Sequence, residues 1–218
     1  MTRASHVLSW QTWLSVVLYS MGFLITALGI ILVLRSDFGA GPWDAVPYNL
    51  RALTGITLGT ASFIINMSIL IFILSYRRRI RYLFMLVPIV SMATAIDLWD
   101  LWLIPNLIPS NVMTASVFFV VGLVFISLGL AATVVSGFPA MVFEEWTLAL
   151  MELFKTRRFY RVRIGIECLA VVLAAIFGFL AGVRFGAIGL GTVLIALSIG
   201  PMIHIFMRHL RVLLKRPE

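Results

Sequence analysis

The chain has 218 residues, of which 61% are hydrophobic and 12% are charged, and its mean hydropathy is +1.07. Soluble globular domains are about 45 to 50% apolar, so this composition excludes an ordinary soluble domain. The formal net charge is +8, but the chain has no soluble basic domain that would bind a polynucleotide. We therefore expect a polytopic protein whose main partner is the lipid bilayer, and no nucleic-acid partner.

Six segments are long and apolar enough to cross a membrane, which takes roughly 20 mostly apolar residues. The predicted fold class is therefore all-α, a membrane helix bundle of six transmembrane spans. A lone cysteine, Cys168, lies inside the fifth span and can form no intrachain disulfide. The predicted spans cover about 14–34, 57–76, 82–104, 113–135, 164–183 and 186–207.

The basic residues are concentrated in loops that would lie on one side of the membrane. If the N-terminus is cytoplasmic, 14 of the 17 Lys and Arg residues fall inside, and only Arg35, Arg51 and Arg184 fall outside. This asymmetry follows the positive-inside rule. We expect both termini in the cytoplasm and the basic residues near anionic headgroups.

Residues 22–38 and 122–138 resemble each other at an offset of 100. If each half holds three spans, the odd number inverts the second half relative to the first. The pattern predicts a 3+3 inverted repeat with halves 1–110 and 111–218, which is typical of transporters. The identical positions are Gly22/Gly122, Leu28/Leu128, Gly29/Gly129, Ser36/Ser136 and Phe38/Phe138.

The repeated spans are each followed by a break that is expected to lead into a short helix. In the first half, Gly41 weakens the helix and Pro42 suits the first position of a new helix. That helix would carry Trp43 and Asp44 in its first turn and end near Gly55. It is too short to cross a bilayer and too apolar for a plain loop, which favours a re-entrant or interfacial helix.

The second half has a matching break, in which Gly137 and Pro139 precede a short apolar helix through Trp146. The acidic residues of this helix include Glu144 and Glu145, which follow the break much as an acid does in the first half. We expect the two breaks to converge and to present free backbone N–H groups to a shared cavity. Helix N-termini attract anions, including the carboxylate of an amino-acid-like solute.

Several glycine and proline landmarks resemble those of the YczE/YyaS/YitT family of bacterial integral membrane proteins. They are Gly-Ala-Gly-Pro-Trp-Asp at 39–44, Gly55, Gly59, Gly-Leu-Gly-Thr at 189–192, and Gly200-Pro201. The likeness covers most of the chain. It implies a bacterial cell (inner) membrane protein whose biochemical activity is poorly defined, and it supplies no catalytic residues. The second break departs from the first, since Phe138-Pro139 is not followed by Trp-Asp.

These patterns lead to the hypothesis of a secondary carrier or exporter of a small polar organic solute, with proton coupling as the simplest choice. The expected substrate-binding residues lie at the two breaks. They are Gly41, Pro42, Trp43, Asp44, Gly137, Pro139 and Glu145. The expected coupling residues are Asp97, Glu167 and His204.

Each coupling residue also has a purely structural interpretation. Carboxylates within a membrane usually face a cavity or a partner, but Asp97 lies near an outer aromatic belt and is equally suited to a wet boundary. Glu167 follows Arg163 by one helical turn, which favours an i,i+4 ion pair at the interface. His204 is near the inner surface, where a histidine more often contacts headgroups.

The expected substrate-binding residues also have purely structural interpretations. Asp44 beside Trp43 also suits a helix-start acid next to an interfacial aromatic. Glu144 and Glu145 equally suit a solvated cytoplasmic charge cluster with the basic residues that follow them. Asn66, in the middle of the second span, is expected to form a helix–helix hydrogen bond.

Sequence motifs for metal sites, nucleotide-driven pumps and nucleophilic catalysis are absent. We expect no cofactor, no metal and no enzymatic activity. The competing class is a non-transporting membrane scaffold or regulatory protein that works through its glycine faces, because a fold does not prove a function. A bundle of this size is also compatible with a homodimer.

Overall fold

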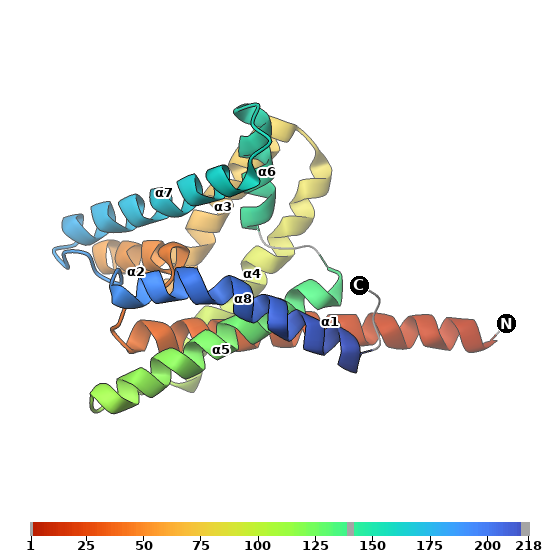
Figure 1. The fold of residues 1–218 in the computed structure, drawn as a ribbon, viewed down its shortest axis with the longest axis horizontal. Coiled ribbons are helices and arrows are strands. Elements are labelled where there is room, and N and C mark those ends of the chain that lie inside the picture. Colours follow the sequence, from red (N-terminus) through yellow and green to blue (C-terminus); the bar gives the residue numbers. More distant parts are fainter. Residues whose placement is uncertain (1, 139–141, 215–218) are drawn as a thin grey trace.

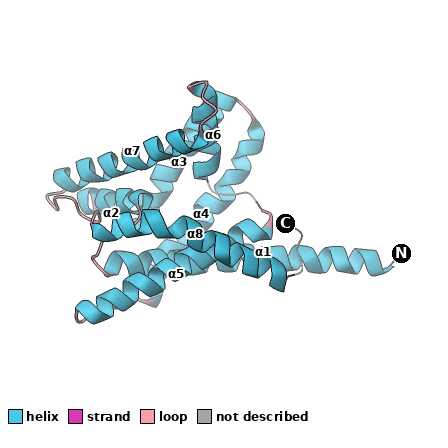
Figure 2. Cartoon of the chain, viewed as in Figure 1, coloured by secondary structure: helices cyan, strands magenta, loops and turns pink. Residues whose placement is uncertain are grey.

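The computed structural model describes residues 2–138 and 142–214, with side chains from residue 12 onward (Figure 1). The described residues are helical and contain no strand (Figure 2). A 3₁₀-helix, η1, and a π-helix, η2, flank the fourth α-helix. In chain order the elements are α1 (Thr2–Arg35), α2 (Pro42–Thr54), α3 (Leu58–Arg77), η1 (Ile80–Met85), α4 (Leu86–Asp97), η2 (Leu98–Leu103), α5 (Val112–Ser136), α6 (Val142–Leu153), α7 (Phe159–Leu180) and α8 (Leu190–Leu213).

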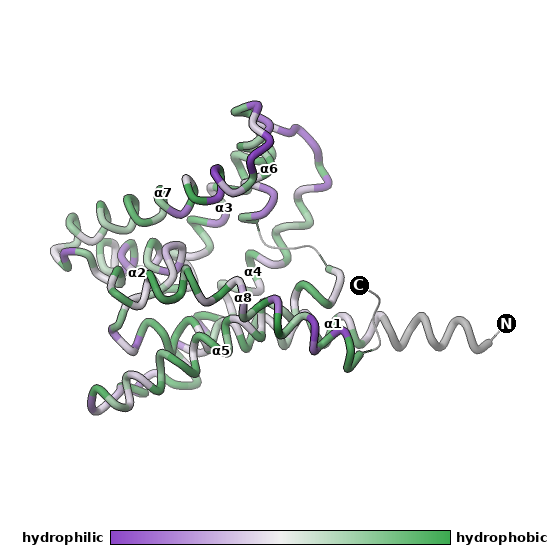
Figure 3. The backbone as a smooth tube through the Cα atoms, viewed as in Figure 1, coloured by the Kyte–Doolittle hydropathy of each residue, from purple (hydrophilic) through white to green (hydrophobic). Residues whose placement is uncertain are grey.

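Six helical stretches are long and apolar enough to span a bilayer, as the sequence predicted. Figure 3 shows apolar residues along all of them and polar residues gathered around the turn after α3 and the loop after α6. This pattern is that of a multi-pass membrane protein. The stretches are Thr12–Arg35, Leu58–Arg77, Ile80–Leu103, Val112–Ser136, Phe159–Leu180 and Leu190–Leu213.

The third span differs from the single helix that was expected, because it is built from η1, α4 and η2 in succession. Pro88 lies in the first turn of α4, where a missing backbone N–H is tolerated. At the other end, the indole N–H of Trp99 donates to the carbonyl of Leu24 at 2.9 Å, which fastens η2 to α1. Asp100 lies within this π-helical turn.

Glycines bring α1 and α5 together in the middle of the bundle. A Cβ added to Gly29 would lie 2.6 Å from the carbonyl oxygen of Gly122, and one added to Gly129 would lie 2.6 Å from that of Gly22. Since Gly22 faces Gly129 and Gly29 faces Gly122, the two helices run antiparallel, side by side (Figure 1). These glycines therefore allow the two backbones to approach closely, as small residues do between membrane helices.

The breaks after α1 and α5 have the same local geometry. Ser36 Oγ donates to the carbonyl of Val33 at 2.6 Å and accepts from the backbone N–H of Phe38 at 3.3 Å. Asp37, between them, adopts the left-handed conformation with φ 59°. The second break repeats these features at Ser136, Gly137 (φ 80°) and Phe138, with Ser136 Oγ 2.6 Å from the carbonyl of Thr133 and 3.2 Å from the Phe138 N–H.

The short helix α2 begins at Pro42 and ends before Gly55, as the sequence predicted. Gly55 closes it in the left-handed conformation, with φ 76°, and donates its N–H to the carbonyl of Arg51. The second short helix, α6, is described from Val142, and Pro139 lies outside the described residues. Both short helices pack against α3 and α7, so they lie within the bundle.

Candidate functional site

The first turns of α2 and α6 meet through aromatic rings. The ring of Trp43 lies 4.9 Å from that of Phe143 and 5.3 Å from that of Trp146, measured between ring centroids. The indole Nε1 of Trp43 is fully buried and has no hydrogen-bond acceptor among the described residues. A buried donor without an acceptor is costly, so this indole is a candidate to bind an oxygen atom of a ligand.

Carboxylates from three helices surround this aromatic contact. Asp44 follows Trp43 on α2, Glu144 follows Phe143 on α6, and Glu167 lies on α7, which packs against both short helices. The charge of Glu167 acts on Asp44, and that of Glu144 acts on Glu167. Asp44 and Glu167 are half-buried and Glu144 is exposed.

Arg163 supplies positive charge to this group. It forms an ion pair with Glu167 at 3.0 Å, one helical turn along α7, which confirms the predicted i,i+4 pair. Its charge also acts on Glu144. Within the described part of the chain, neither Asp44 nor Glu144 forms an ion pair of its own. We call Trp43, Asp44, Phe143, Glu144 and Glu167 the central cluster.

Asp44 is held at the start of α2 by the tight turn at Gly41. A Cβ on Gly41 would lie 2.8 Å from the Asp44 carboxylate, so a larger residue there would displace this side chain. No described residue donates a hydrogen bond to the carboxylate. Burial, helped by the negative charge of Glu167, raises the pKa of Asp44 to about 7. A group with this pKa binds and releases protons at neutral pH.

Glu145 belongs to a different set of contacts. Arg77, at the end of α3, pairs with Glu145 at 2.9 Å and with Glu152 at 2.7 Å, and also donates to the hydroxyl of Tyr82. These contacts tie α6 to α3 and η1. The predicted binding residue Glu145 therefore has a partner already, whereas its neighbour Glu144 faces the central cluster.

A fully buried amide, Asn49, fixes the position of α2 against the second half of the chain. Its Nδ2 donates to the carbonyls of Ala174 at 2.7 Å and Phe185 at 3.1 Å, and its Oδ1 accepts from the N–H of Ala187 at 3.1 Å. Gly186 lets the loop come this close, since a Cβ there would overlap Asn49. Sequence reasoning missed Asn49, although a lone amide on an apolar helix face is a signal of buried hydrogen bonding.

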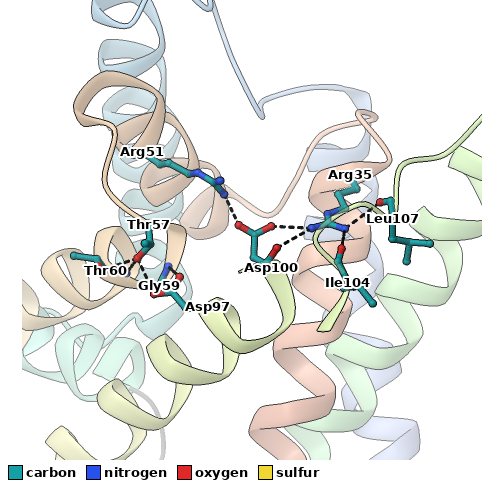
Figure 4. A network of polar contacts seen from close by, with 9 residues as sticks. All are labelled: Arg35, Arg51, Thr57, Gly59, Thr60, Asp97, Asp100, Ile104 and Leu107. Carbon is teal, nitrogen blue, oxygen red and sulfur yellow. Dashed lines mark hydrogen bonds and ion pairs between the residues drawn. The ribbon is translucent and has the colours of Figure 1, made fainter. Parts of the chain in front are cut away.

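Asp97 lies in a separate polar network around the ends of α2, α3 and α4 (Figure 4). Its carboxylate accepts from the Thr57 hydroxyl at 2.6 Å and from the Gly59 N–H at 2.7 Å, so it caps the start of α3. It also lines a shallow groove of about 380 Å³ between α3 and α4. The structure does not bring Asp97 into the central cluster.

Three residues after Asp97, Asp100 pairs with two arginines that were expected on the outer, non-cytoplasmic side of the membrane. Its carboxylate contacts Arg35 at 3.0 Å and Arg51 at 2.5 Å (Figure 4). Arg35 also donates to the carbonyls of Ile104 and Leu107. Asp100 thus joins α1, α2 and η2, which sequence analysis did not foresee.

The remaining predicted residues are dispersed. His204 is exposed on α8 and Gly137 caps the end of α5. Asn66 donates to the carbonyl of Ser62 on its own helix, so the expected bond to another helix is not formed by that amide. The structure therefore brings together the first-break residues and Glu167, and it adds Phe143 and Glu144 from the second half.

Within the described part of the chain, no group of three His, Cys, Asp or Glu side chains is placed to hold a metal ion. The carboxylates of the central cluster do not form such a group.

Comparisons with known proteins find a matching family and similar proteins in two bacteria. The sequence profile of a family of unknown function (DUF6198) matches residues 13–208. The uncharacterized protein YyaS of Bacillus subtilis is 33% identical over 190 residues, which cover 87% of this chain and 90% of that protein. An uncharacterized protein of Haemophilus influenzae is 24% identical over 194 residues, or 89% and 83% of the two chains. No solved structure matches the chain.

Proposed function

The chain belongs to the family of unknown function DUF6198, so its activity has to be argued from its own residues, and we propose that it is a secondary carrier or exporter of a small polar organic solute. The likeness to YyaS bears out the family resemblance seen in the sequence. The proposal places the solute at the central cluster and couples its movement to protons through Asp44.

Reciprocal contacts support an inverted repeat as the basis of this carrier. The ring of Phe38 lies 5.9 Å from that of Phe119, and the ring of Phe138 lies 5.2 Å from that of Tyr19. Adding 100 to the number of Phe38 gives Phe138, and subtracting 100 from the number of Phe119 gives Tyr19. The second pair is therefore the first pair with the two halves exchanged. The glycine contacts between α1 and α5 exchange in the same way. This exchange is expected of two halves related by a two-fold axis in the membrane plane.

The observation that carries the proposal is the meeting of equivalent residues at the start of the two short helices. Trp43 and Phe143 are related by the offset of 100 and touch each other, and the acids Asp44 and Glu144 come next in each half. In carriers built from inverted repeats, broken helices from both halves form the solute site in this way. Both short helices would then be re-entrant.

We place the protein in a bacterial inner membrane with both termini in the cytoplasm. The basic residues that follow α3 and α6 support this orientation, because they gather at the same end of the bundle (Figure 3). Cysteine labelling of Asn111→Cys in a Cys168→Ser background tests it. Labelling by a membrane-impermeant reagent from outside the cell is expected, and labelling from the cytoplasm alone contradicts the orientation.

The test of function is solute flux into proteoliposomes that contain the purified full-length protein. A metabolite panel is assayed with and without a pH gradient. We expect one class of solute to move with the gradient, and Asp44→Asn to abolish the dependence on pH. The matched control is Asp37→Asn, seven residues away, because Asp37 is exposed outside the cluster and asparagine also tolerates its left-handed conformation.

A scaffold or regulatory protein is the alternative outcome of this test. If no solute moves, and Asp44→Asn and Glu167→Gln leave the cellular phenotype intact, the carrier proposal fails. The glycine faces of α1 and α5 already pack against each other, so a scaffold would have to use another surface.

A further inference from the structure

We propose that the solute bound by the central cluster is an organic cation, such as a quaternary or protonated amine, rather than an anion. This inference rests on the proposed function for its transport step, but not for the binding itself. It reverses the expectation from the sequence, in which the helix N-termini would attract a carboxylate. The argument follows from the charges, the rings and one unpartnered group at the cluster.

The positive ends of both short helices already face acidic side chains. Asp44 lies in the first turn of α2, and Glu144 and Glu145 lie in the first turn of α6. An anionic solute would approach these fixed negative charges and be repelled. The attraction that a bare helix N-terminus offers to anions is therefore cancelled here.

The balance of charge at the cluster is negative. Arg163 is paired with Glu167 at 3.0 Å, and Arg77 is paired with Glu145 at 2.9 Å. Asp44 and Glu144 are left without an ion pair among the described residues. The charge of Glu167 acts on Asp44, and that of Glu144 acts on Glu167, so with the basic neighbours already engaged these carboxylates favour a ligand of positive charge.

The aromatic rings supply the second part of the recognition. The ring of Trp43 lies 4.9 Å from that of Phe143 and 5.3 Å from that of Trp146, and Asp44 and Glu144 directly follow Trp43 and Phe143 in the chain. The faces of such rings attract ammonium groups, tryptophan most strongly. An acidic cluster alone would equally bind water or a metal ion, whereas rings and carboxylates together favour an organic ammonium.

The buried indole N–H of Trp43 points to a ligand independently of the acids. It has no acceptor among the described residues, although its nitrogen is removed from solvent. A hydroxyl or carbonyl oxygen on the ligand would satisfy it. The solute class is thus an ammonium compound that also carries an oxygen atom.

Proton coupling follows from competition for the same carboxylate. Asp44, with a pKa of about 7, holds either a proton or the cation. The charge of Glu167 acts on Asp44, that of Glu144 acts on Glu167, and that of Arg163 acts on both glutamates. Cation binding therefore releases a proton, which is the requirement for exchange of cations against protons.

Binding is measured by isothermal titration calorimetry on the full-length protein in detergent. The probes are tetramethylammonium, choline, tetraethylammonium and benzyltrimethylammonium, with 3,3-dimethylbutan-1-ol and 3,3-dimethylbutanoate as the neutral and anionic counterparts of choline. We expect at least one cation to bind about tenfold or more tighter than both counterparts. Its affinity should rise between pH 5.5 and 8.5, because these quaternary ions do not titrate.

Two variants link binding to the cluster. Asp44→Asn should weaken the cation about tenfold and remove the dependence on pH, and Glu144→Gln, at an exposed position, should weaken it without removing that dependence. Asp37→Asn should bind as the wild type does. If Asp44→Asn does not fold, Glu144→Gln decides the question.

Failure of this inference is distinguishable from failure of the carrier. If no cation binds more tightly than its counterparts, or if Glu144→Gln binds cations unchanged, the cation site is wrong, whatever the proteoliposomes transport. If a cation binds with the expected pH dependence but neither it nor protons cross the membrane, the site stands and the carrier is wrong.

Discussion

Replacing Gly29 by alanine should force α1 and α5 apart. The new Cβ would lie 2.6 Å from both the Gly122 carbonyl oxygen and the Ile126 backbone nitrogen, which is 0.8 Å short of the 3.4 Å at which ordinary contact begins. Backbone atoms cannot rotate away as side chains do, so the helices must separate. Overpacking costs about 1–3 kcal/mol, and the better helix propensity of alanine returns up to about 1 kcal/mol. We expect Gly29→Ala to lower stability by roughly 2 kcal/mol.

The assay is thermal unfolding of purified protein in detergent, where a loss of this size corresponds to about 4–8 °C in Tm. Gly200→Ala on α8 is the matched control, because no atom lies within 4 Å of a Cβ at that position. It should leave Tm unchanged or raise it slightly. Since Gly29 and Gly122 face each other, the double substitution should cost less than the sum of the single ones.

The reasoning is refuted if Gly29→Ala unfolds at the temperature of the wild type, or if Gly200→Ala is equally damaging. Additive losses at Gly29 and Gly122 would also contradict a shared contact. Equal losses at all four glycines of the crossing would further strengthen the case for an inverted repeat.

Three further outcomes are expected in the same unfolding assay. Asn49→Leu should cost about 2–4 kcal/mol, because it removes the partners of three buried backbone groups, whereas Asn66→Leu, whose amide bonds within its own helix, should cost far less. Asp100→Asn should cost about 2–3 kcal/mol of stability, which is less than the loss of a fully buried ion pair because Arg51 is 37% exposed. An unchanged Tm would show that the ion pairs of Asp100 with Arg35 and Arg51 do not stabilise the fold. The pKa of Asp44 is raised from 3.8 to about 7, so the folded state holds a proton that the unfolded chain releases, and the wild type should lose stability as pH rises across this window. Asp44→Asn should flatten that loss between about pH 4 and pH 7, and a slope equal to that of the wild type would contradict the assignment.

The sequence by itself determined the elements of the protein and much of their placement. The six spans follow from runs of apolar residues, because a bilayer demands helices of that length. The start of α2 at Pro42 and its end before Gly55 follow from the local conformational preferences of proline and glycine. The close contact between Gly22 and Gly129 was foreseeable because glycines two turns apart share a helix face.

Only the tertiary structure decided which polar residues meet. Asp97, Glu167 and His204 were all candidates for coupling, yet the fold assigns Asp97 to the cap of α3 and leaves His204 exposed. Successive side chains of α6 point about 100° apart around the helix, so Glu144 and Glu145 face different neighbours. Glu144 acts on Glu167, whereas Glu145 pairs with Arg77. Such pairings depend on contacts between residues that are 38 to 123 positions apart in the chain, from Gly59 and Asp97 to Asp44 and Glu167, and local sequence carries no record of those distances.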